Sequence, residues 1–192
     1  MKKIILASGS PRRKEILEAV GAKFEIVTSD IEEVVRQGES PETVVAALAF
    51  EKAIDVAEKM EEGALVIAAD TIVYKDKIMG KPKDEADAFS MLQSLRNDKH
   101  TVLTGFCVME VGTLNKIVHV VETTVYTKDY SDEKIKAYIA SGEVFGKAGA
   151  YAIQGLGGLL IDRIEGDYLN VVGLPVSALE VVLEKHFDTR FL

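Results

Sequence analysis

The sequence predicts an α/β fold in which helices flank a mixed, strongly bent central sheet. Helical and strand patterns alternate along the chain, which is typical of α/β domains. Pairs of β-rich runs joined by short turns are too frequent for a purely parallel sheet. The 192 residues are 47% hydrophobic, enough to fill a core, and no repeat or Pro/Ser-rich linker divides them. We therefore expect one domain, or two closely fused lobes.

The chain opens with a strand, a tight turn and a helix. Ile4 to Ala7 is a short continuous apolar run, as in a buried strand. Ser10 is a good N-cap residue, and Pro11 suits the first helical position because its missing N–H is not needed there. Apolar residues then recur at helical spacing as far as Gly21, which can end the helix.

The same signals continue through the first half. Ser40-Pro41 repeats the cap-then-proline pattern and starts a long helix to about Met60, and Asp84 caps another. Strands are expected over Phe24 to Thr28 and Leu65 to Ala69, followed by a small hairpin of Thr71 to Tyr74 with Ile78 to Met79.

The second half is richer in hairpins. A long hairpin is expected from Thr101 to Val111 and Lys116 to Thr127, and a shorter one from Leu159 to Ile164 and Tyr168 to Val172. Between them, Ser131 caps a helix that ends near Gly142, and the glycine-rich stretch Gly146 to Gly158 reads as a backbone-shaped loop. Pro175 opens the last helix, which reaches about His186.

The charge pattern limits the classes of ligand. Lys and Arg total 23 and Asp and Glu total 31, so the net charge is −8 and the pI is near 5.0. A general nucleic-acid binder needs surplus basic charge to displace counterions, so we expect no polymeric nucleic acid as a partner. Yet the first acid is Glu15, and the segment before it holds five basic residues: Lys2, Lys3, Arg12, Arg13 and Lys14.

The cysteine content and the apolar runs suggest a compartment. The single cysteine, Cys107, cannot form an internal disulfide, which favours reducing conditions. The apolar run after the first lysines is shorter than the roughly 7 residues that a signal peptide needs. No stretch approaches the roughly 20 apolar residues of a membrane helix, so we expect a cytoplasmic protein with no membrane partner.

The segment Ser8-Gly9-Ser10-Pro11-Arg12-Arg13 is a candidate anion site. A helix N-terminus presents free N–H groups and a partial positive charge that can hold phosphate, and guanidinium groups match phosphate geometry. The positive charges of Arg12 and Arg13 in the first helical turn oppose the helix dipole, so they cost stability unless an anion lies nearby. The alternative is two ordinary surface arginines beside a capped helix. The segment is not a Walker A loop, because no G-K-[ST] follows.

Two carboxylates could complete a metal or proton-transfer site. Asp70 follows the run Leu65 to Ala69, and ligands of open α/β sheets gather beyond the carboxyl ends of strands. Glu33, in the acidic loop Asp30 to Glu33, could be a second ligand, since Mg²⁺ needs few protein ligands. The alternatives are an acid that caps a turn and a solvated loop.

Three further side chains could bind a nucleotide. Lys52, in a mostly apolar helical stretch, and Lys81, in Gly80-Lys81-Pro82, could each reach a phosphate, or they are surface lysines. Gln154, among small and apolar residues, could read a base edge, or it makes a structural hydrogen bond to backbone. Cys107 lies in an apolar strand, where core packing is expected rather than nucleophilic chemistry.

In combination, these segments resemble the Maf-type nucleoside triphosphate pyrophosphatases. The resemblance covers essentially the whole chain, and the motifs occur in the family's order: Leu6 to Arg13, Ile31 to Glu33, Glu51 to Ala53, Ala69 to Val73, Gly80 to Pro82, Thr104-Gly105, Gly149 to Gly158 and Val172 to Pro175. At Arg12, Thr71 and Gln154 the chain is similar to the branch that acts on dTTP and UTP. The 7-methyl-GTP branch has Trp in place of Arg12, and this chain has no Trp.

The resemblance implies an activity, a cofactor and an assembly. The activity is hydrolysis of a nucleoside triphosphate between its α and β phosphates, giving the monophosphate and pyrophosphate, with Mg²⁺ or Mn²⁺ as the divalent metal. A single domain over residues 1–192 would form two lobes around a nucleotide-binding cleft, and two copies would form a homodimer.

The resemblance also implies roles for the candidate residues. Ser8, Arg13, Lys52 and Lys81 would stabilise the phosphates, and Arg12, Thr71 and Gln154 would discriminate the base. Asp70 would accept the proton of the attacking water or hold the metal, with Glu33 as the second metal contact.

Two other functions remain open from the sequence. One is a regulatory inhibitor of septum formation that acts through partner contacts. The other is a nucleotidyltransferase or sugar-phosphate enzyme that uses the same anion site.

Overall fold

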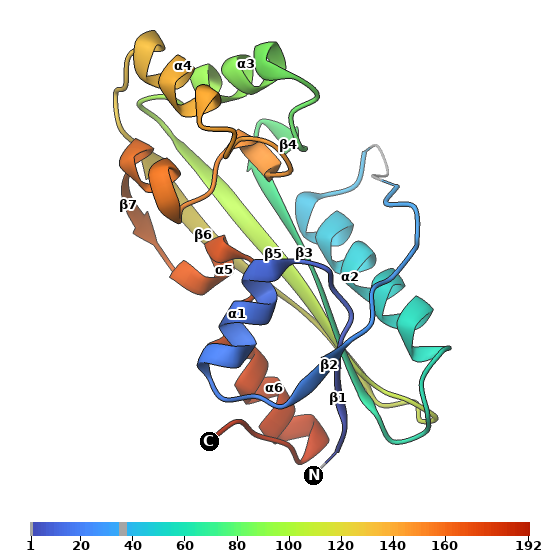
Figure 1. Ribbon diagram of the computed structural model, residues 1–192. Coiled ribbons are helices and arrows are strands. Elements are labelled where there is room, and N and C mark those ends of the chain that lie inside the picture. Colours follow the sequence, from blue (N-terminus) through green and yellow to red (C-terminus); the bar gives the residue numbers. More distant parts are fainter. Residues whose placement is uncertain (1, 35–37) are drawn as a thin grey trace. The chain divides into compact units, whose positions relative to one another are not determined.

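The computed structural model describes residues 2–34 and 38–192 as a mixed α/β structure (Figure 1). The strands are β1 (Ile4–Leu6), β2 (Phe24–Ile26), β3 (Leu65–Lys75), β4 (Lys77–Met79), β5 (Lys99–Glu110), β6 (Lys116–Thr127) and β7 (Ile161–Glu165). The helices are α1 (Pro11–Ala19), α2 (Pro41–Ala57), α3 (Glu85–Leu95), α4 (Asp132–Ala140), α5 (Tyr168–Val172) and α6 (Val176–Phe187), with short 3-10 helices η1 (Ala148–Ala150) and η2 (Gly155–Leu160).

The sheet is mixed, as predicted. Its strand order is β2-β1-β3-β5-β6-β7, with β4 paired to β3. β1 runs parallel to both β2 and β3, whereas β4 is antiparallel to β3 and β7 is antiparallel to β6. The adjacent strands β5 and β6 are joined by a short turn and form the predicted long hairpin.

The contacts divide the chain into two compact units. Unit 1 comprises residues 1–70, 104–121 and 173–192, and unit 2 comprises residues 71–103 and 122–172. Strands β3, β5 and β6 each contribute residues to both units.

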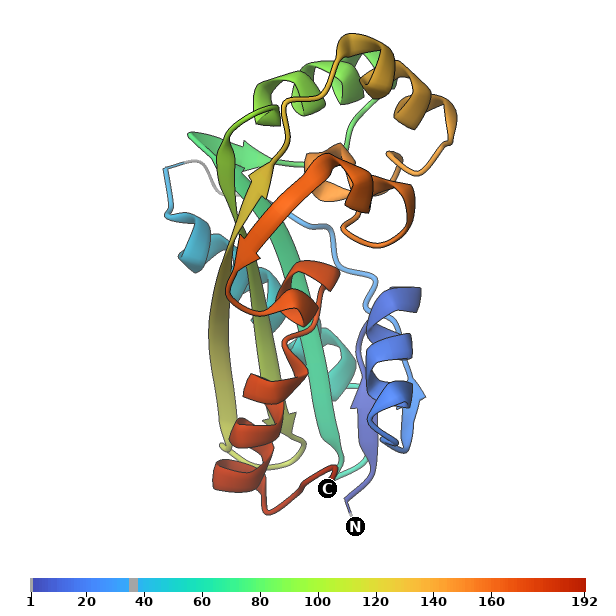
Figure 2. The same cartoon turned by 90° about the vertical axis from the view of Figure 1, so that its left-hand side faces the viewer.

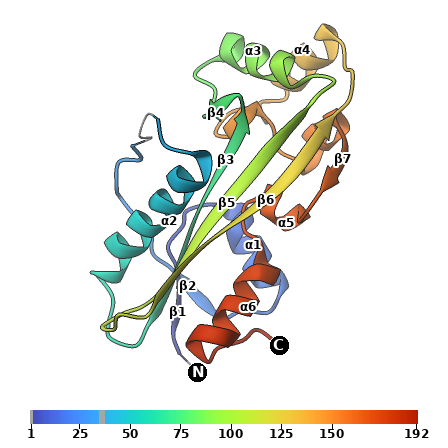
Figure 3. The ribbon, with the colours of Figure 1, turned by 180° about the vertical axis from the view of Figure 1, so that it is seen from behind.

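The core of unit 1 explains why α2 can lie close to the strands. Within unit 1, Figures 1 and 3 show α2 on one face of the strands and α1 and α6 on the other face. The α2 face is built mainly from small residues at strand and helix spacing: Ile5, Ala7, Ala49, Ala53, Val56, Ala64, Val66, Ala68 and Cys107. In β5, a Cβ added at Gly105 would lie 2.6 Å from the carbonyl oxygen of Val45, so this approach requires glycine.

The core of unit 2 lies between strands and the helices α3 and α4, which lie side by side in Figure 2. It includes Leu92 and Leu95 of α3 together with Ile135 and Ile139 of α4. Both helices begin where predicted, because Asp84 accepts a hydrogen bond from Asp87 N and Ser131 accepts one from Lys134 N.

The predicted hairpin of Leu159 to Ile164 with Tyr168 to Val172 is wrong in its second arm. Tyr168 to Val172 forms helix α5, and β7 pairs with β6 instead. The Asp167 carboxylate accepts hydrogen bonds from the backbone N–H groups of Leu169 (2.7 Å) and Asn170 (3.3 Å), as an N-cap does. Capping therefore outweighs the strand preference of the valines.

Other predicted boundaries also need correction. The first arm of that hairpin begins at Ile161 rather than Leu159, and the loop Gly146 to Gly158 holds η1 and the start of η2. Strand β3 does not end at Ala69 but continues to Lys75. Ser10 stands at the N-cap position of α1, but its side chain makes no capping bond.

Candidate active site

The start of α1 holds the half-buried Arg13 against the segment that follows β1. Arg13 donates from Nη1 to Ser8 Oγ (3.0 Å) and from Nε to the carbonyl oxygen of Gly173 (2.8 Å). Ser8 is 8% exposed, and its Oγ also accepts a hydrogen bond from Ser10 N (3.3 Å). Ser10 therefore shapes this turn through its backbone, while Ser8 supplies the hydroxyl.

The charge of Arg13 is influenced by its neighbours. Burial lowers the pKa of the Arg13 guanidinium from its usual value. The Asp70 carboxylate opposes this lowering of the pKa, Arg12 adds to it and Glu33 opposes it. Arginine is effectively always protonated in proteins, so Arg13 remains a cation close to two carboxylates.

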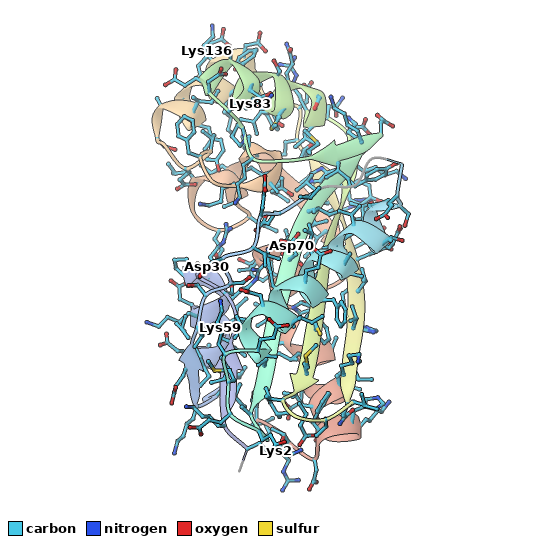
Figure 4. The ribbon with its side chains drawn as sticks, turned by 90° about the vertical axis from the view of Figure 1, so that its right-hand side faces the viewer. Lys2, Asp30, Lys59, Asp70, Lys83 and Lys136 are labelled. Carbon is cyan, nitrogen blue, oxygen red and sulfur yellow. The ribbon has the colours of Figure 1, made fainter. Side chains whose placement is uncertain are left out.

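Lys52 joins the two predicted carboxylates. Its Nζ lies 2.6 Å from Asp70 Oδ1 and 2.8 Å from Glu33 Oε1. The side chains of Lys52 and Asp70 are only 12% and 11% exposed, whereas Glu33 is 47% exposed. Figure 4 shows Asp70 on β3 beside α2, the helix that supplies Lys52. The structure thus brings together five predicted residues of unit 1: Ser8, Arg13, Glu33, Lys52 and Asp70.

Sheet geometry explains this convergence. β1 and β3 are parallel, with Leu6 opposite Ile67, and the N–H of Ala7 donates to the carbonyl oxygen of Ile67 (2.8 Å). β1 then ends and the chain turns into α1, whereas β3 continues past Asp70. Asp70 therefore lies where a parallel neighbour leaves the sheet, although not at a strand end as predicted. Such positions are typical ligand sites in α/β sheets.

The acidic loop is anchored to α2 by residues that sequence reasoning missed. The Asp55 carboxylate accepts a hydrogen bond from Asp30 N (3.1 Å) and pairs with Lys59 Nζ (3.2 Å), which also lies 3.8 Å from Asp30 Oδ2 (Figure 4). The pKa of Asp55 is lowered by several contacts, and the largest effect comes from a hydrogen bond with the Ser29 side chain. The signal in the sequence was the spacing, because Asp55 and Lys59 follow Lys52 at helical intervals.

The other predicted residues are distributed over both units. Arg12 is half-buried in the first turn of α1, directly before Arg13. Thr71, Lys81 and Gln154 belong to unit 2: Thr71 is half-buried in β3 directly after Asp70, Lys81 is exposed after β4, and Gln154 is exposed directly before η2.

The donor set suits a hard divalent cation. Asp70 and Glu33 direct carboxylate oxygens to one point, the position of Lys52 Nζ, beside the Arg13–Ser8 pair. Within residues 2–34 and 38–192, no group of three or more His, Cys, Asp and Glu side chains could hold a metal by itself. Mg²⁺ is commonly bound through one or two carboxylates, with waters and substrate phosphates as the remaining ligands, so these residues fit such a cation.

His100 and Cys107 lie in cores rather than in this site. His100 Nε2 lies 2.7 Å from the Tyr151 hydroxyl, and burial lowers the pKa of His100 to about 4, so it is neutral near pH 7. Cys107 is fully buried, which confirms the prediction of a core residue, and burial raises the pKa of its thiol to about 12.

Among the helices of the described residues, none has the length and apolar content to cross a membrane.

Comparison with known proteins identifies the family. Residues 3–186 match the family model described as Maf-like protein. A protein named dTTP/UTP pyrophosphatase from Alkaliphilus metalliredigens is 47% identical over 192 residues, and its namesake from Alkaliphilus oremlandii is 48% identical over 192 residues; both matches cover 100% of each chain. A protein of the same name from Thermoanaerobacter sp. is 48% identical over 191 residues, covering 99% of this chain and 100% of the relative.

Similarity to solved structures is weaker. The Ham1 protein of Staphylococcus aureus is 15% identical with a TM-score of 0.49, covering 67% of this chain and 73% of that one. A HAM1 protein from Coxiella burnetii also has 15% identity and a TM-score of 0.49, with 68% and 75% covered. The family match and the full-length relatives are sufficient, and they show that the chain belongs to the Maf family.

Proposed function

We propose that this chain is a nucleoside triphosphate pyrophosphatase that hydrolyses dTTP and UTP to the monophosphate and pyrophosphate. The observation behind the proposal is the cluster of Asp70, Lys52 and Glu33 beside Arg13 and Ser8, in a chain whose full-length relatives are named dTTP/UTP pyrophosphatases. In this proposal both units act together as a single domain over residues 1–192.

In the proposed reaction, a water oxygen forms a bond to the α phosphorus while the bond from that phosphorus to the bridging oxygen breaks. The pyrophosphate leaves with the bridging oxygen and the electron pair of the broken bond. Asp70 accepts the proton that the water loses. Cationic groups lower the barrier because negative charge grows on the leaving pyrophosphate.

Side chains of unit 1 are suited to these tasks. Arg13 is held rigidly by Ser8 and Gly173, so little conformational freedom is lost when it binds a phosphate. Lys52 is held between Asp70 and Glu33, where it can orient the Asp70 carboxylate until substrate arrives. We assign Lys81 to phosphate binding as well.

A divalent cation, Mg²⁺ or Mn²⁺, belongs to the proposal. Asp70 and Glu33 would hold it, and when bound it would neutralise phosphate charge and polarise the attacked phosphorus. Lys52, which pairs with both carboxylates, would contribute its ammonium to binding of the phosphates.

Base discrimination is assigned to Arg12, Thr71 and Gln154. An amide such as Gln154 offers both a donor and an acceptor, the combination needed to read the edge of uracil or thymine. The proposal further includes a homodimer, to be checked by analytical ultracentrifugation, and a cytoplasmic location. The names of the relatives lend no support to the alternative of a septation inhibitor.

The experiment uses the purified chain with Mg²⁺ and a panel of canonical and modified nucleoside triphosphates. Release of pyrophosphate and monophosphate, greatest with dTTP and UTP and without any added acceptor, is the expected result. Dependence on an acceptor would indicate a transferase instead. Asp70→Asn should abolish turnover while nucleotide binding persists, and near-normal turnover in that variant would refute the assignment of Asp70.

A further inference from the structure

Side chains outside the unit 1 cluster hold the backbone of the segment that contains Gln154. We call residues 151–158 the Gln154 segment; it follows α4 in unit 2 and is drawn in orange below α4 in Figure 2. Gln154 itself is exposed and lies directly before η2. An exposed residue on a short loop can serve for recognition only if the backbone beneath it is held in place.

Tyr138 holds the segment before Gln154. Its hydroxyl oxygen, on the buried side chain of an α4 residue, accepts a hydrogen bond from Ala152 N (3.2 Å). The chain then folds back on itself, so that a Cβ added at Gly157 would overlap the carbonyl oxygen of Ala152 and lie 2.7 Å from the Tyr138 hydroxyl. Gly157 is therefore required for this close return.

Glu143 holds the segment after Gln154. Its Oε1 accepts a hydrogen bond from Leu156 N (3.2 Å), and its Oε2 accepts one from Gly157 N (3.3 Å). These are among the N–H groups at the start of η2, which no residue within that helix can satisfy. A Cβ added at Gly155 would lie 2.8 Å from Glu143 Oε1, so glycine at this position lets the carboxylate approach.

The end of α4 directs Glu143 towards these N–H groups. Ser141 Oγ donates to the carbonyl oxygen of Tyr138 (2.6 Å) and accepts a hydrogen bond from Glu143 N (3.3 Å). Gly142, with a φ of 78°, reverses the chain between them. The two groups that hold the Gln154 segment therefore come from the last turn of α4 and from the reversal of the chain directly after it.

We infer that Glu143 is a positioning residue for base discrimination, which acts by fixing the backbone on both sides of Gln154 together with Tyr138. The inference rests on the proposed function, because it assigns Gln154 to the base. Two hydrogen bonds to one carboxylate restrain Leu156 and Gly157, and the bond to Tyr138 restrains Ala152. Gln154 is left with little freedom to move between them.

The test compares UTP with CTP, which differ only in the donor and acceptor groups of the base edge. In Glu143→Ala, the ratio of kcat/KM for UTP to that for CTP should fall by about tenfold, as expected when one hydrogen bond to a base is lost. The change should appear mainly in KM for UTP. Glu143→Gln keeps an acceptor oxygen and should restore most of the ratio. Hydrogen exchange at Leu156 N and Gly157 N should accelerate in Glu143→Ala.

Glu180 provides a matched control. Its carboxylate also accepts backbone hydrogen bonds, from Phe191 N (2.9 Å to Oε1 and 3.0 Å to Oε2) and Leu192 N (3.4 Å), but it belongs to unit 1. Glu180→Ala should leave the UTP-to-CTP ratio unchanged. If Glu143→Ala does not fold, Glu143→Asp keeps the charge but shortens the side chain, and its ratio should fall by an intermediate amount.

Two results would overturn the inference. An active Glu143→Ala variant with the wild-type ratio, or with unchanged exchange at Leu156 and Gly157, would refute the positioning role alone. A wild-type chain that releases no pyrophosphate from any nucleoside triphosphate would refute the proposed function, and the positioning role with it.

Discussion

Removing the shared ammonium of the candidate site should destabilise the protein, and a second substitution should restore part of that loss. Lys52 lies 2.6 Å from Asp70 and 2.8 Å from Glu33, and the side chains of Lys52 and Asp70 are close to 90% buried. In Lys52→Met, the Asp70 carboxylate stays in place without its nearest cation. Breaking a buried ion pair from one side costs about 3–5 kcal/mol. The Arg13 cation also attracts the Asp70 carboxylate, so we expect the lower end, about 3 kcal/mol.

The double variant Lys52→Met, Asp70→Asn decides whether an unpaired charge causes this loss. The neutral amide of Asn leaves no unpaired buried charge when Lys52 is replaced. The double variant should therefore be more stable than Lys52→Met alone, by about 1–2 kcal/mol. Asp70→Asn by itself should cost about 1 kcal/mol, because the amide oxygen still accepts from Lys52. In both Lys52→Met and Asp70→Asn, the rate of pyrophosphate release should fall by a factor on the order of 100 or more.

Urea unfolding at neutral pH with EDTA present measures these free energies without a contribution from bound metal. Lys14→Met is the control, because the exposed Lys14 pairs with Glu18 at 3.6 Å and should change stability by about 0.5 kcal/mol or less. A double variant that is less stable than Lys52→Met would refute the reasoning, since the loss would then come from packing.

Three further predictions concern stability. Burial lowers the pKa of His100 to about 4, below its ordinary value of 6.5, so the unfolded chain binds this proton first as pH falls. The contribution of neutral His100 to the free energy of unfolding should thus be complete above about pH 6.5 and should decline by about 3 kcal/mol towards pH 4. Urea unfolding of the wild type and of His100→Gln at pH 7.5 and 4.5 tests this, because the difference between their free energies of unfolding should narrow at the lower pH. A constant difference would contradict the prediction. Gly105→Ala places a methyl group 2.6 Å from the Val45 carbonyl oxygen and should cost about 2 kcal/mol, measured as a lower midpoint of urea unfolding. Asp167→Ala removes the cap of α5 and should cost about 1 kcal/mol, whereas Asp167→Asn should keep most of the stability.

Local signals predicted the elements that begin with a cap, because a cap is a contact between residues near in sequence. Ser40, Asp84 and Ser131 each accept a hydrogen bond from the backbone three residues later, as their positions indicated. The same rule, applied to Asp167, would have identified α5. The valines that follow favoured a strand instead, and that preference depends on neighbours that a single sequence does not reveal.

By itself, the sequence determined the mixed α/β class, the starts of most helices and the Maf-type motifs, and it predicted the residues of a candidate site. Those properties follow from periodicity, capping and short motifs, which are local. Only the tertiary structure decided that Lys52 joins Asp70 to Glu33, that Asp55 anchors the acidic loop, and that Glu143 holds the segment around Gln154. Each of these contacts joins side chains or backbone groups that are brought together by strand pairing, helix packing or a reversal of the chain. A sequence pattern identifies which groups are available, whereas packing decides which of them meet.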